Sequence, residues 1–184
     1  MRRTQHTRTF CGTMVLSWIG TMACTVTGDD HQLPPPAMRG DHVFRLEDPV
    51  SILRVTDGDT IDVDFNGQQE SVRFKGIDAP ELFTDPPEPF AAEARNFVFD
   101  HTGSEVDLEF DSHCAAPPEC RDSTSSRRML AYIRLADGSD LGARLLEEGL
   151  AAVFVFAGQP FDRQSEYEAI ETEAQANGKG MWQQ

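Results

Sequence analysis

The amino-acid sequence predicts an α+β protein built on a five-stranded Greek-key β-barrel with three helices. Two hairpin turns follow one another early in the folded region, strand-like and helix-like patterns then alternate, and two helical patterns end the chain. With 184 residues, of which 39% are hydrophobic and 26% charged, the chain can bury the core of one such domain.

The first three strands are expected to form an antiparallel meander. Hydrophobic and polar residues alternate from Ser51 to Val63, and Asp57-Gly58 is a dipeptide typical of tight hairpins. Asn66-Gly67 is a second hairpin signal, and it leads into a third strand from Ser71 to Ile77.

A helix and two further strands come next. Apolar residues recur at helical spacing over residues 90–101, which predicts an amphipathic helix. Alternating apolar residues predict a fourth strand at Val106–Phe110 and a fifth at Met129–Leu135, before the turn signal Asp137-Gly138.

The C-terminal part is predicted to hold two helices. Asp140 can cap a short helix that stops at Gly149, and residues 152–156 form a brief apolar extended segment. Ser165 and Glu168 have the capping-box pattern for a last helix that ends at Asn177-Gly178. This order of strands and helices is typical of the OB-fold.

The N-terminal segment differs in character from the rest. Residues 1–24 combine a basic start with an apolar stretch too short to span a membrane, which predicts a signal peptide. Cys24 follows a small residue, so lipid attachment at Cys24 and ordinary signal cleavage are both open. Residues 25–48 are polar and rich in proline and predict a flexible tether, followed by the folded domain at 49–184. We expect an exported monomer, secreted or anchored to the cell envelope, with no obligate protein partner.

Charge and cysteine content restrict the possible functions. The net charge of −15 argues against a protein that coats nucleic acid, although screening beyond about 8 Å leaves room for a local cationic cleft. Cys114 and Cys120 flank a short irregular loop, and in an exported protein they predict a disulfide. The alternative is a metal site with His113, but the spacing matches no common zinc pattern.

Charged residues at the ends of the early strands indicate phosphodiester chemistry. Asp57-Gly58-Asp59-Thr60 and the run Arg73–Glu81 place carboxylates and an arginine on consecutive strands, and Arg128 precedes the fifth strand. Carboxylates can hold a hard cation, guanidinium groups match phosphate oxygens, and a spare carboxylate can activate water. Each motif alone is usually a plain turn or a surface charge, but their order and spacing together are specific.

From about Val50 to Trp182 the sequence resembles the staphylococcal nuclease-like (thermonuclease) family. The matching runs are Val55–Thr60, Arg73–Glu81, Arg128–Ile133, Glu148–Ala151 and Glu173–Trp182. The family has a five-stranded OB barrel with three helices, in agreement with the pattern above. The resemblance implies a calcium-dependent nuclease acting on DNA and RNA with low sequence specificity.

The resemblance also implies a role for individual residues in binding the metal. Asp59 and Asp78 align with carboxylates that bind Ca²⁺, and Ala79 aligns with a residue that contributes its main-chain carbonyl. A threonine is common at that last position, but the alanine supplies the same carbonyl. Oxygen ligands of this kind suit calcium.

Three further residues carry the implied catalytic roles. Glu81 aligns with the glutamate that orients or deprotonates the attacking water. Arg73 and Arg128 align with the two arginines that bind the scissile phosphate and its more charged transition state.

The chain departs from the family in the segment before Arg128. The family usually has an acidic residue, a basic residue, a tyrosine and a glycine there, whereas this chain has Thr124–Arg127. The groups that hold a terminal phosphate in the family are therefore absent from this segment, and they are groups that affect nucleotide affinity and end preference. Arg127 compensates for that loss in one interpretation, and in another it replaces Arg128 as the catalytic group.

Two other features border the implied site. Phe154 and Phe156 fall near tyrosines that line the family's nucleotide pocket; they either stack on bases or pack beneath the last helix. The insertion from Asp111 to Ser126 either shapes substrate access or stabilises a loop outside the cell.

Two other classes of function are consistent with the sequence. One is a noncatalytic OB-type module that binds nucleic acid or protein at the cell surface. The other is an acidic calcium-binding protein, but Arg73 and Arg128 count against it because a pure calcium site gains nothing from nearby cations.

Overall fold

The computed structural model describes residues 44–183 except 47, 115 and 119. The predicted signal peptide, Cys24 and nearly all of the predicted tether lie outside the described residues. Within the described part of the chain, no helix is both long and apolar enough to cross a membrane.

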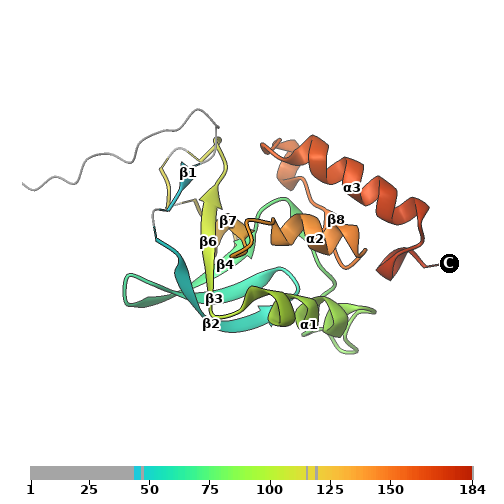
Figure 1. Cartoon of the computed structure of the whole chain (residues 1–184), viewed down its shortest axis with the longest axis horizontal. Helices are drawn as coiled ribbons and strands as arrows, with labels where there is room; N and C mark the ends of the chain where they lie inside the picture. The colour runs from blue at the N-terminus through green and yellow to red at the C-terminus, as the bar shows by residue number, and fades with distance from the viewer. Residues whose placement is uncertain (1–43, 47, 115, 119, 184) are drawn as a thin grey trace, which may run out of the picture. The chain divides into compact units, whose positions relative to one another are not determined.

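Five strands close into a barrel, which confirms the predicted OB-fold α+β architecture (Figure 1). Three of them form the antiparallel meander β2–β3–β4, β4 pairs in parallel with β7, and β6 pairs antiparallel with both β7 and β2. Their bounds are β2 Val50–Asp57, β3 Thr60–Phe65, β4 Gln68–Phe74, β6 Glu105–Phe110 and β7 Met129–Arg134.

Three short strands lie outside the ring. β1 (Phe44–Arg45) pairs with β6 and falls within the last residues of the predicted tether. β5 (Ile77–Asp78) pairs with β8 (Ala152–Val153) in a separate two-stranded sheet.

The predicted third strand, Ser71–Ile77, is wrong at its C-terminal end. β4 stops at Phe74, and the chain turns before β5 because Gly76 adopts a φ of +83°. A Cβ at Gly76 would lie 2.5 Å from the Phe161 ring, so the bend requires glycine. This turn places Arg73 and Asp78 on different strands.

The described residues include three α-helices, as predicted: α1 (Ala91–Thr102), α2 (Leu141–Glu147) and α3 (Gln164–Ala176). α1 contacts β2, while α2 contacts both β7 and α3 (Figure 1). Asp140 caps α2, because its carboxylate accepts from the N–H groups of residues 142 and 143. Two short 3₁₀ turns, Phe156–Gly158 and Gly180–Trp182, flank α3.

The predicted capping box at the start of α3 is wrong. The helix begins at Gln164, Arg163 occupies the N-cap position, and Ser165 lies inside the first turn. The Arg163 guanidinium pairs with Glu109 and Asp140, which fixes the chain immediately before the helix. These partners lie far away in the sequence, so the local pattern did not reveal them.

Gly58 lies where the β2–β3 turn meets α1. The turn residues are Gly58 and Asp59, one position later than predicted, because Asp57 pairs with Thr60 across the hairpin. A Cβ at Gly58 would lie 2.6 Å from the Cβ of Ala94 and 2.7 Å from that of Ala79. The glycine therefore allows α1 to pack directly against the turn.

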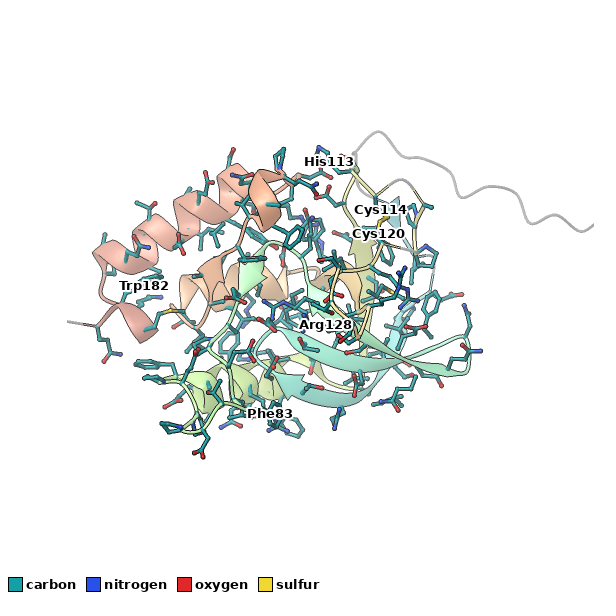
Figure 2. All side chains as sticks on the ribbon, turned by 180° about the vertical axis from the view of Figure 1, so that it is seen from behind. Phe83, His113, Cys114, Cys120, Arg128 and Trp182 are labelled. Carbon is teal, nitrogen blue, oxygen red and sulfur yellow. A yellow bond between two sulfur atoms is a disulfide. The ribbon has the colours of Figure 1, made fainter. Side chains whose placement is uncertain are left out.

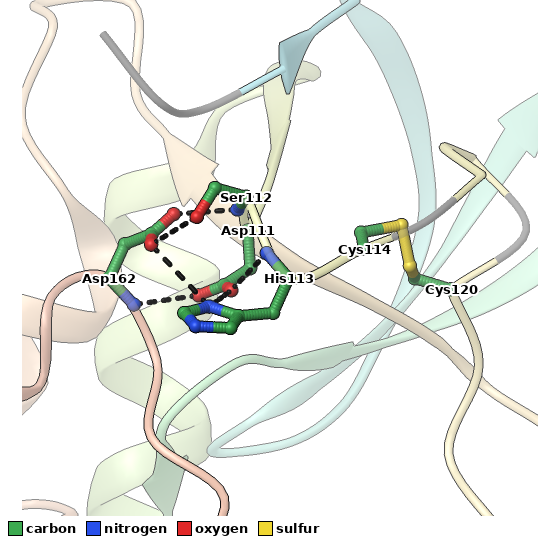
Figure 3. The surroundings of a disulfide bond; sticks show 6 residues. All are labelled: Asp111, Ser112, His113, Cys114, Cys120 and Asp162. Atoms are coloured by element: carbon green, nitrogen blue, oxygen red, sulfur yellow. Dashed lines mark hydrogen bonds and ion pairs between the residues drawn. A yellow bond between two sulfur atoms is a disulfide. The ribbon is translucent and has the colours of Figure 1, made fainter.

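Asp111, at the end of β6, joins three parts of the chain (Figure 3). Its buried carboxylate accepts from the N–H groups of His113 (2.9 Å) and Asp162 (2.8 Å) and from the Tyr132 hydroxyl. Burial alone would raise the pKa of Asp111, but these hydrogen bonds outweigh it and hold the pKa below 3.8. The network connects β6, β7 and the segment that leads into α3.

The insertion begins at this network, and Cys114 and Cys120 form the predicted disulfide within it (Figure 3). The alternative metal site made of His113 and the two cysteines is wrong, since the sulfurs are bonded to each other. His113 instead lies beside Asp111, with Nδ1 2.7 Å from its carboxylate.

We predict that Gly58→Ala lowers the free energy of unfolding by about 1–3 kcal/mol, because the added methyl group overlaps two packed alanines. Urea unfolding measures the loss. Gly67→Ala is the control, since its Cβ would meet nothing within 4 Å and it should cost only the strain of a positive φ, about 1 kcal/mol. A Gly58→Ala protein no less stable than that control would contradict the close packing.

We predict that Asp111→Asn lowers the free energy of unfolding near pH 7 by about 1–3 kcal/mol. A depressed carboxyl pKa contributes stability above the unfolded value of 3.8 and loses it as the pH falls through the folded value. The variant should therefore lose less stability than wild type between pH 5 and about pH 2. Asp85→Asn, an exposed loop change, should leave the acid dependence unaltered.

Candidate active site

Three neighbouring strands bring the predicted site residues to one region of the barrel. In the registers β3–β4 and β4–β7, Thr60 lies opposite Arg73 and Arg73 opposite Leu130. Asp59 immediately precedes β3, and Arg128 immediately precedes β7. The site is therefore built on strand ends whose positions the barrel ladder fixes.

Arg73 is the central group of this region. Its buried guanidinium forms ion pairs with Asp59 and Asp78, and Nη2 also donates to the Ile77 carbonyl at 3.3 Å. Asp78 itself is exposed on β5. One arginine thus links both of the carboxylates that the sequence assigned to metal binding.

Asp59 is almost completely buried, with 1% of its surface exposed. Its carboxylate accepts from the Ala79 N–H at 2.8 Å and from the Thr60 hydroxyl at 3.0 Å. Burial raises the pKa of Asp59 to about 7, although Arg73 and the Ala79 N–H lower it. An added cation would relieve this remaining cost of holding a charge in the interior.

Arg128 joins the same cluster through Thr60. Its Nη1 lies 3.4 Å from the Thr60 hydroxyl oxygen, and that hydroxyl donates to Asp59. Its Nε donates to Asp122 at 2.8 Å, and Figure 2 shows Arg128 among the barrel strands. Arg127 is exposed, with a φ of +47°. Of the two arginines, Arg128 is the one that contacts the cluster.

Glu81 follows β5 and lies on the exposed loop that also carries Phe83 (Figure 2). Its N–H donates to the Glu88 carboxylate at 2.9 Å, and its carbonyl accepts from the Glu88 N–H at 3.0 Å, which closes the loop. Partial burial, followed by the charge of Asp57, raises the pKa of Glu81 against the opposing effect of Arg73. The Glu81 carboxyl is therefore electrostatically coupled to the same cluster.

Sequence reasoning did not assign three residues of this region. Asp57, interpreted as part of a turn, is buried and accepts from the Asp59 N–H at 3.3 Å. Thr60 links Asp59 to Arg128, and Asp122 holds Arg128 from the insertion. Asp57 and Thr60 both lie in Val55–Thr60, one of the runs that resemble the family, so the sequence contained a signal for them. Asp122 lies outside every such run.

Asp59, Asp78 and Ala79 offer a donor set that fits a hard cation. Two of them supply carboxylates that share one arginine, and the main chain of Ala79 is held beside Asp59 by a hydrogen bond. Oxygen ligands of this kind suit Ca²⁺ or Mg²⁺ better than softer metals.

Asp111, His113 and Asp162 form a second group that could hold a metal, with ligand atoms within 4.8 Å of one another. Internal hydrogen bonds already engage both oxygens of the Asp111 carboxylate (Figure 3). The geometry is accounted for as a structural network, and we assign no metal to it.

The rings of Phe154 and Phe156 are 45% and 53% exposed, so they do not pack beneath α3. Their centroids lie 6.5 Å apart. The Phe154 N–H donates to the Gly76 carbonyl at 2.9 Å, which ties this aromatic pair to the turn between Arg73 and Asp78.

An OB barrel with paired carboxylates and two arginines at its strand ends has the features of a phosphodiester-cleaving enzyme. The chain belongs to the staphylococcal nuclease-like family: the family model described as "Staphylococcal nuclease homologue" matches residues 71–184. This membership places the protein among nucleases, which are hydrolases.

Individual relatives agree with the family model. The thermonuclease of Staphylococcus hyicus is 33% identical over 140 residues, covering 74% of this chain and 76% of that protein. The thermonuclease of Staphylococcus intermedius is 35% identical over 136 residues, covering 72% and 74%. Endonuclease YncB of Bacillus subtilis is 33% identical over 140 residues, covering 72% of this chain and 61% of that protein.

Proposed function

We propose that this protein is an exported, calcium-dependent endonuclease that hydrolyses phosphodiester bonds of DNA and RNA with low sequence specificity. The observation that carries the proposal is the ion-paired cluster in which Arg73 bridges Asp59 and Asp78. In this proposal residues 1–24 are a signal peptide, residues 25–48 a tether and residues 49–184 the nuclease domain. The mature protein is a monomer, either secreted or lipid-anchored at Cys24.

The proposed metal ligands are the carboxylates of Asp59 and Asp78 and the main-chain carbonyl of Ala79. Calcium is favoured because every proposed donor atom is oxygen. In addition, Asp78, one of the two carboxylates, is exposed to solvent, which suits a flexible coordination shell. When bound, the cation supplies positive charge that stabilises the phosphate oxygens in the transition state.

Arg73 and Arg128 are the proposed phosphate-binding residues. A guanidinium group presents planar paired donors that match two phosphate oxygens, and a lysine cannot reproduce this geometry. Because each arginine lies at or near a strand end and is anchored by a carboxylate, its donors are oriented before the substrate arrives. Such prior orientation is what makes electrostatic stabilisation of a transition state effective.

Glu81 is the proposed general base. It takes a proton from water as the water oxygen bonds to phosphorus; the bond from phosphorus to the leaving oxygen breaks, and that oxygen keeps the electron pair and takes a proton from solvent. The raised pKa of Glu81, which burial causes first and Asp57 second, makes its carboxylate a stronger base.

The exposed rings of Phe154 and Phe156 are proposed to stack on nucleotide bases. Stacking tolerates any base, which agrees with low sequence specificity. β8, just before these rings, pairs with β5, and Asp78 lies opposite Ala152. This pairing supports a base-binding surface next to the proposed metal ligands.

The deciding experiment incubates the purified protein with plasmid DNA, single-stranded DNA and RNA, in calcium or in chelator. Degradation of all three substrates in calcium alone supports the proposal. Binding without cleavage would point instead to a noncatalytic OB-type module, and calcium uptake with neither would point to an acidic calcium-binding protein.

We predict that Glu81→Gln lowers kcat by about 10²- to 10⁴-fold, because the amide cannot accept the proton, while substrate affinity is retained. Steady-state kinetics and a filter-binding assay measure the two quantities. Asp85→Asn removes a charge from an exposed position of the same loop and should leave kcat within a factor of about 3. Equal losses of turnover and affinity in Glu81→Gln would show that its role is misassigned.

We predict that Arg128→Lys lowers kcat by about 10²- to 10³-fold despite keeping the charge, because the paired donors are lost. Arg127→Lys is the matched control at the adjacent, exposed position, and it should be tolerated. The reverse pattern in the same plasmid assay would identify Arg127 as the phosphate-binding group.

A further inference from the structure

The insertion ends in a hairpin that folds back on the start of β7. The Leu130 N–H donates to the Cys120 carbonyl at 2.8 Å, and the Asp122 N–H donates to the Arg128 carbonyl at 2.9 Å. Arg121 and Met129 pair between these two contacts. The segment that follows the disulfide thus pairs antiparallel with the start of β7 over a few residues. This pairing places Asp122 directly opposite Arg128.

The Asp122 carboxylate holds Arg128 at two points. Oδ2 accepts from the Arg128 side-chain Nε at 2.8 Å, and Oδ1 accepts from the Arg128 main-chain N–H at 3.1 Å. Oδ1 also accepts from the N–H and hydroxyl of Thr124, at 3.2 and 2.7 Å. Both oxygens therefore have partners, and the carboxylate cannot rotate without breaking several hydrogen bonds.

The environment keeps this carboxylate ionised. Only 12% of the Asp122 side chain is exposed, and burial alone would raise its pKa. The hydrogen bonds from Thr124 and Arg128 outweigh that effect and lower the pKa below 3.8. Asp122 is therefore a fixed negative charge at neutral pH.

This contact determines which edge of the guanidinium group is available. Asp122 occupies Nε, and Nη1 is directed at the Thr60 hydroxyl, 3.4 Å away and next to Asp59. An unrestrained arginine has several rotatable bonds, and ordering it costs rotamer entropy. With Nε anchored from the insertion, much of that ordering is complete before a substrate binds.

We propose that Asp122 is the positioning residue for Arg128, and that the disulfide-closed insertion serves to place it there. The inference rests on the proposed function, in which Arg128 binds the scissile phosphate. Asp122 does not touch the substrate; it acts by orienting the guanidinium group. Because its negative charge also weakens the attraction of Arg128 for a phosphate, it improves orientation at the expense of ground-state affinity.

This balance gives a specific kinetic signature. Asp122→Asn retains an oxygen for the turn at Thr124 but lacks the second oxygen that accepts from Arg128 Nε. We expect kcat to fall at least tenfold while KM stays the same or decreases, because the arginine loses its orientation but keeps its charge. A purely structural residue would lower kcat only as far as it lowers the folded fraction.

A double-mutant cycle tests whether Asp122 acts through Arg128. Asp122→Asn and Asp122→Ala are each measured alone and in an Arg128→Ala background, with plasmid DNA as substrate. If the proposal holds, neither change lowers activity further once Arg128 is absent. Additive losses, or an Asp122→Asn protein with wild-type kcat, would overturn it.

Asp137 supplies the matched control. It accepts from the N–H and hydroxyl of Ser139 at 2.9 and 2.6 Å, which is the same turn that Asp122 makes with Thr124. No residue of the candidate site is among its contacts in the described part of the chain. Asp137→Asn should leave kcat and KM unchanged, and a loss equal to that of Asp122→Asn would show that the turn alone matters.

An NMR measurement separates this inference from the proposed function. The Arg128 Nε–H resonance should exchange slowly with solvent in the wild type and in Asp137→Asn, but rapidly in Asp122→Asn. If the wild type cleaves no nucleic acid, the proposed function fails, and the exchange rate still decides whether Asp122 fixes Arg128. Rapid exchange in the wild type would overturn the positioning role regardless of activity.

Discussion

The site depends on one ion-pair arrangement, in which the buried Arg73 lies between the buried Asp59 and the exposed Asp78. A charge in the protein interior is tolerated only when a partner compensates it. Arg73 satisfies this requirement for the buried Asp59 and also pairs with the exposed Asp78, from the C-terminal end of a strand that is hydrogen-bonded on both sides. A turn at Gly58 precedes Asp59 and a turn at Gly76 precedes Asp78, and at both glycines packed side chains leave no room for a Cβ.

The two arginines of the site are held by different parts of the chain. The barrel itself fixes Arg73, whereas Arg128 is anchored by a segment added outside the barrel and closed by a disulfide. In each case a carboxylate orients the guanidinium group, and the groups around Arg73 also match the proposed metal site. Because Asp59, Asp78 and Asp122 neutralise the two arginines, in the proposed function the bound cation supplies the net positive charge that attracts a polyanion to a chain of net charge −15.

Most of the fold was predictable because its signals are local. The Asn66-Gly67 turn has the positive φ angles of a tight hairpin. Asp140 caps α2 by accepting hydrogen bonds from N–H groups only two and three residues further along the chain. The errors arose where a distant partner decided the outcome. The start of α3 depends on the ion pairs of Arg163, and the end of β4 on the Phe161 ring packed over Gly76.

The sequence alone determined the order of the barrel strands and helices and, through its resemblance to a family, which carboxylates and arginines were expected at the candidate site. Strand alternation, turn dipeptides and motifs are properties of neighbouring residues, so they can be read along the chain. Only the three-dimensional structure showed that the Asp57 carboxylate accepts a hydrogen bond from the Asp59 N–H and that the Asp122 carboxylate accepts one from Arg128 Nε. The first contact depends on the conformation of a turn and the second on the conformation of a hairpin. The free energy of burying a charge is set by the groups that surround it in three dimensions, and the order of residues along the chain does not specify those groups.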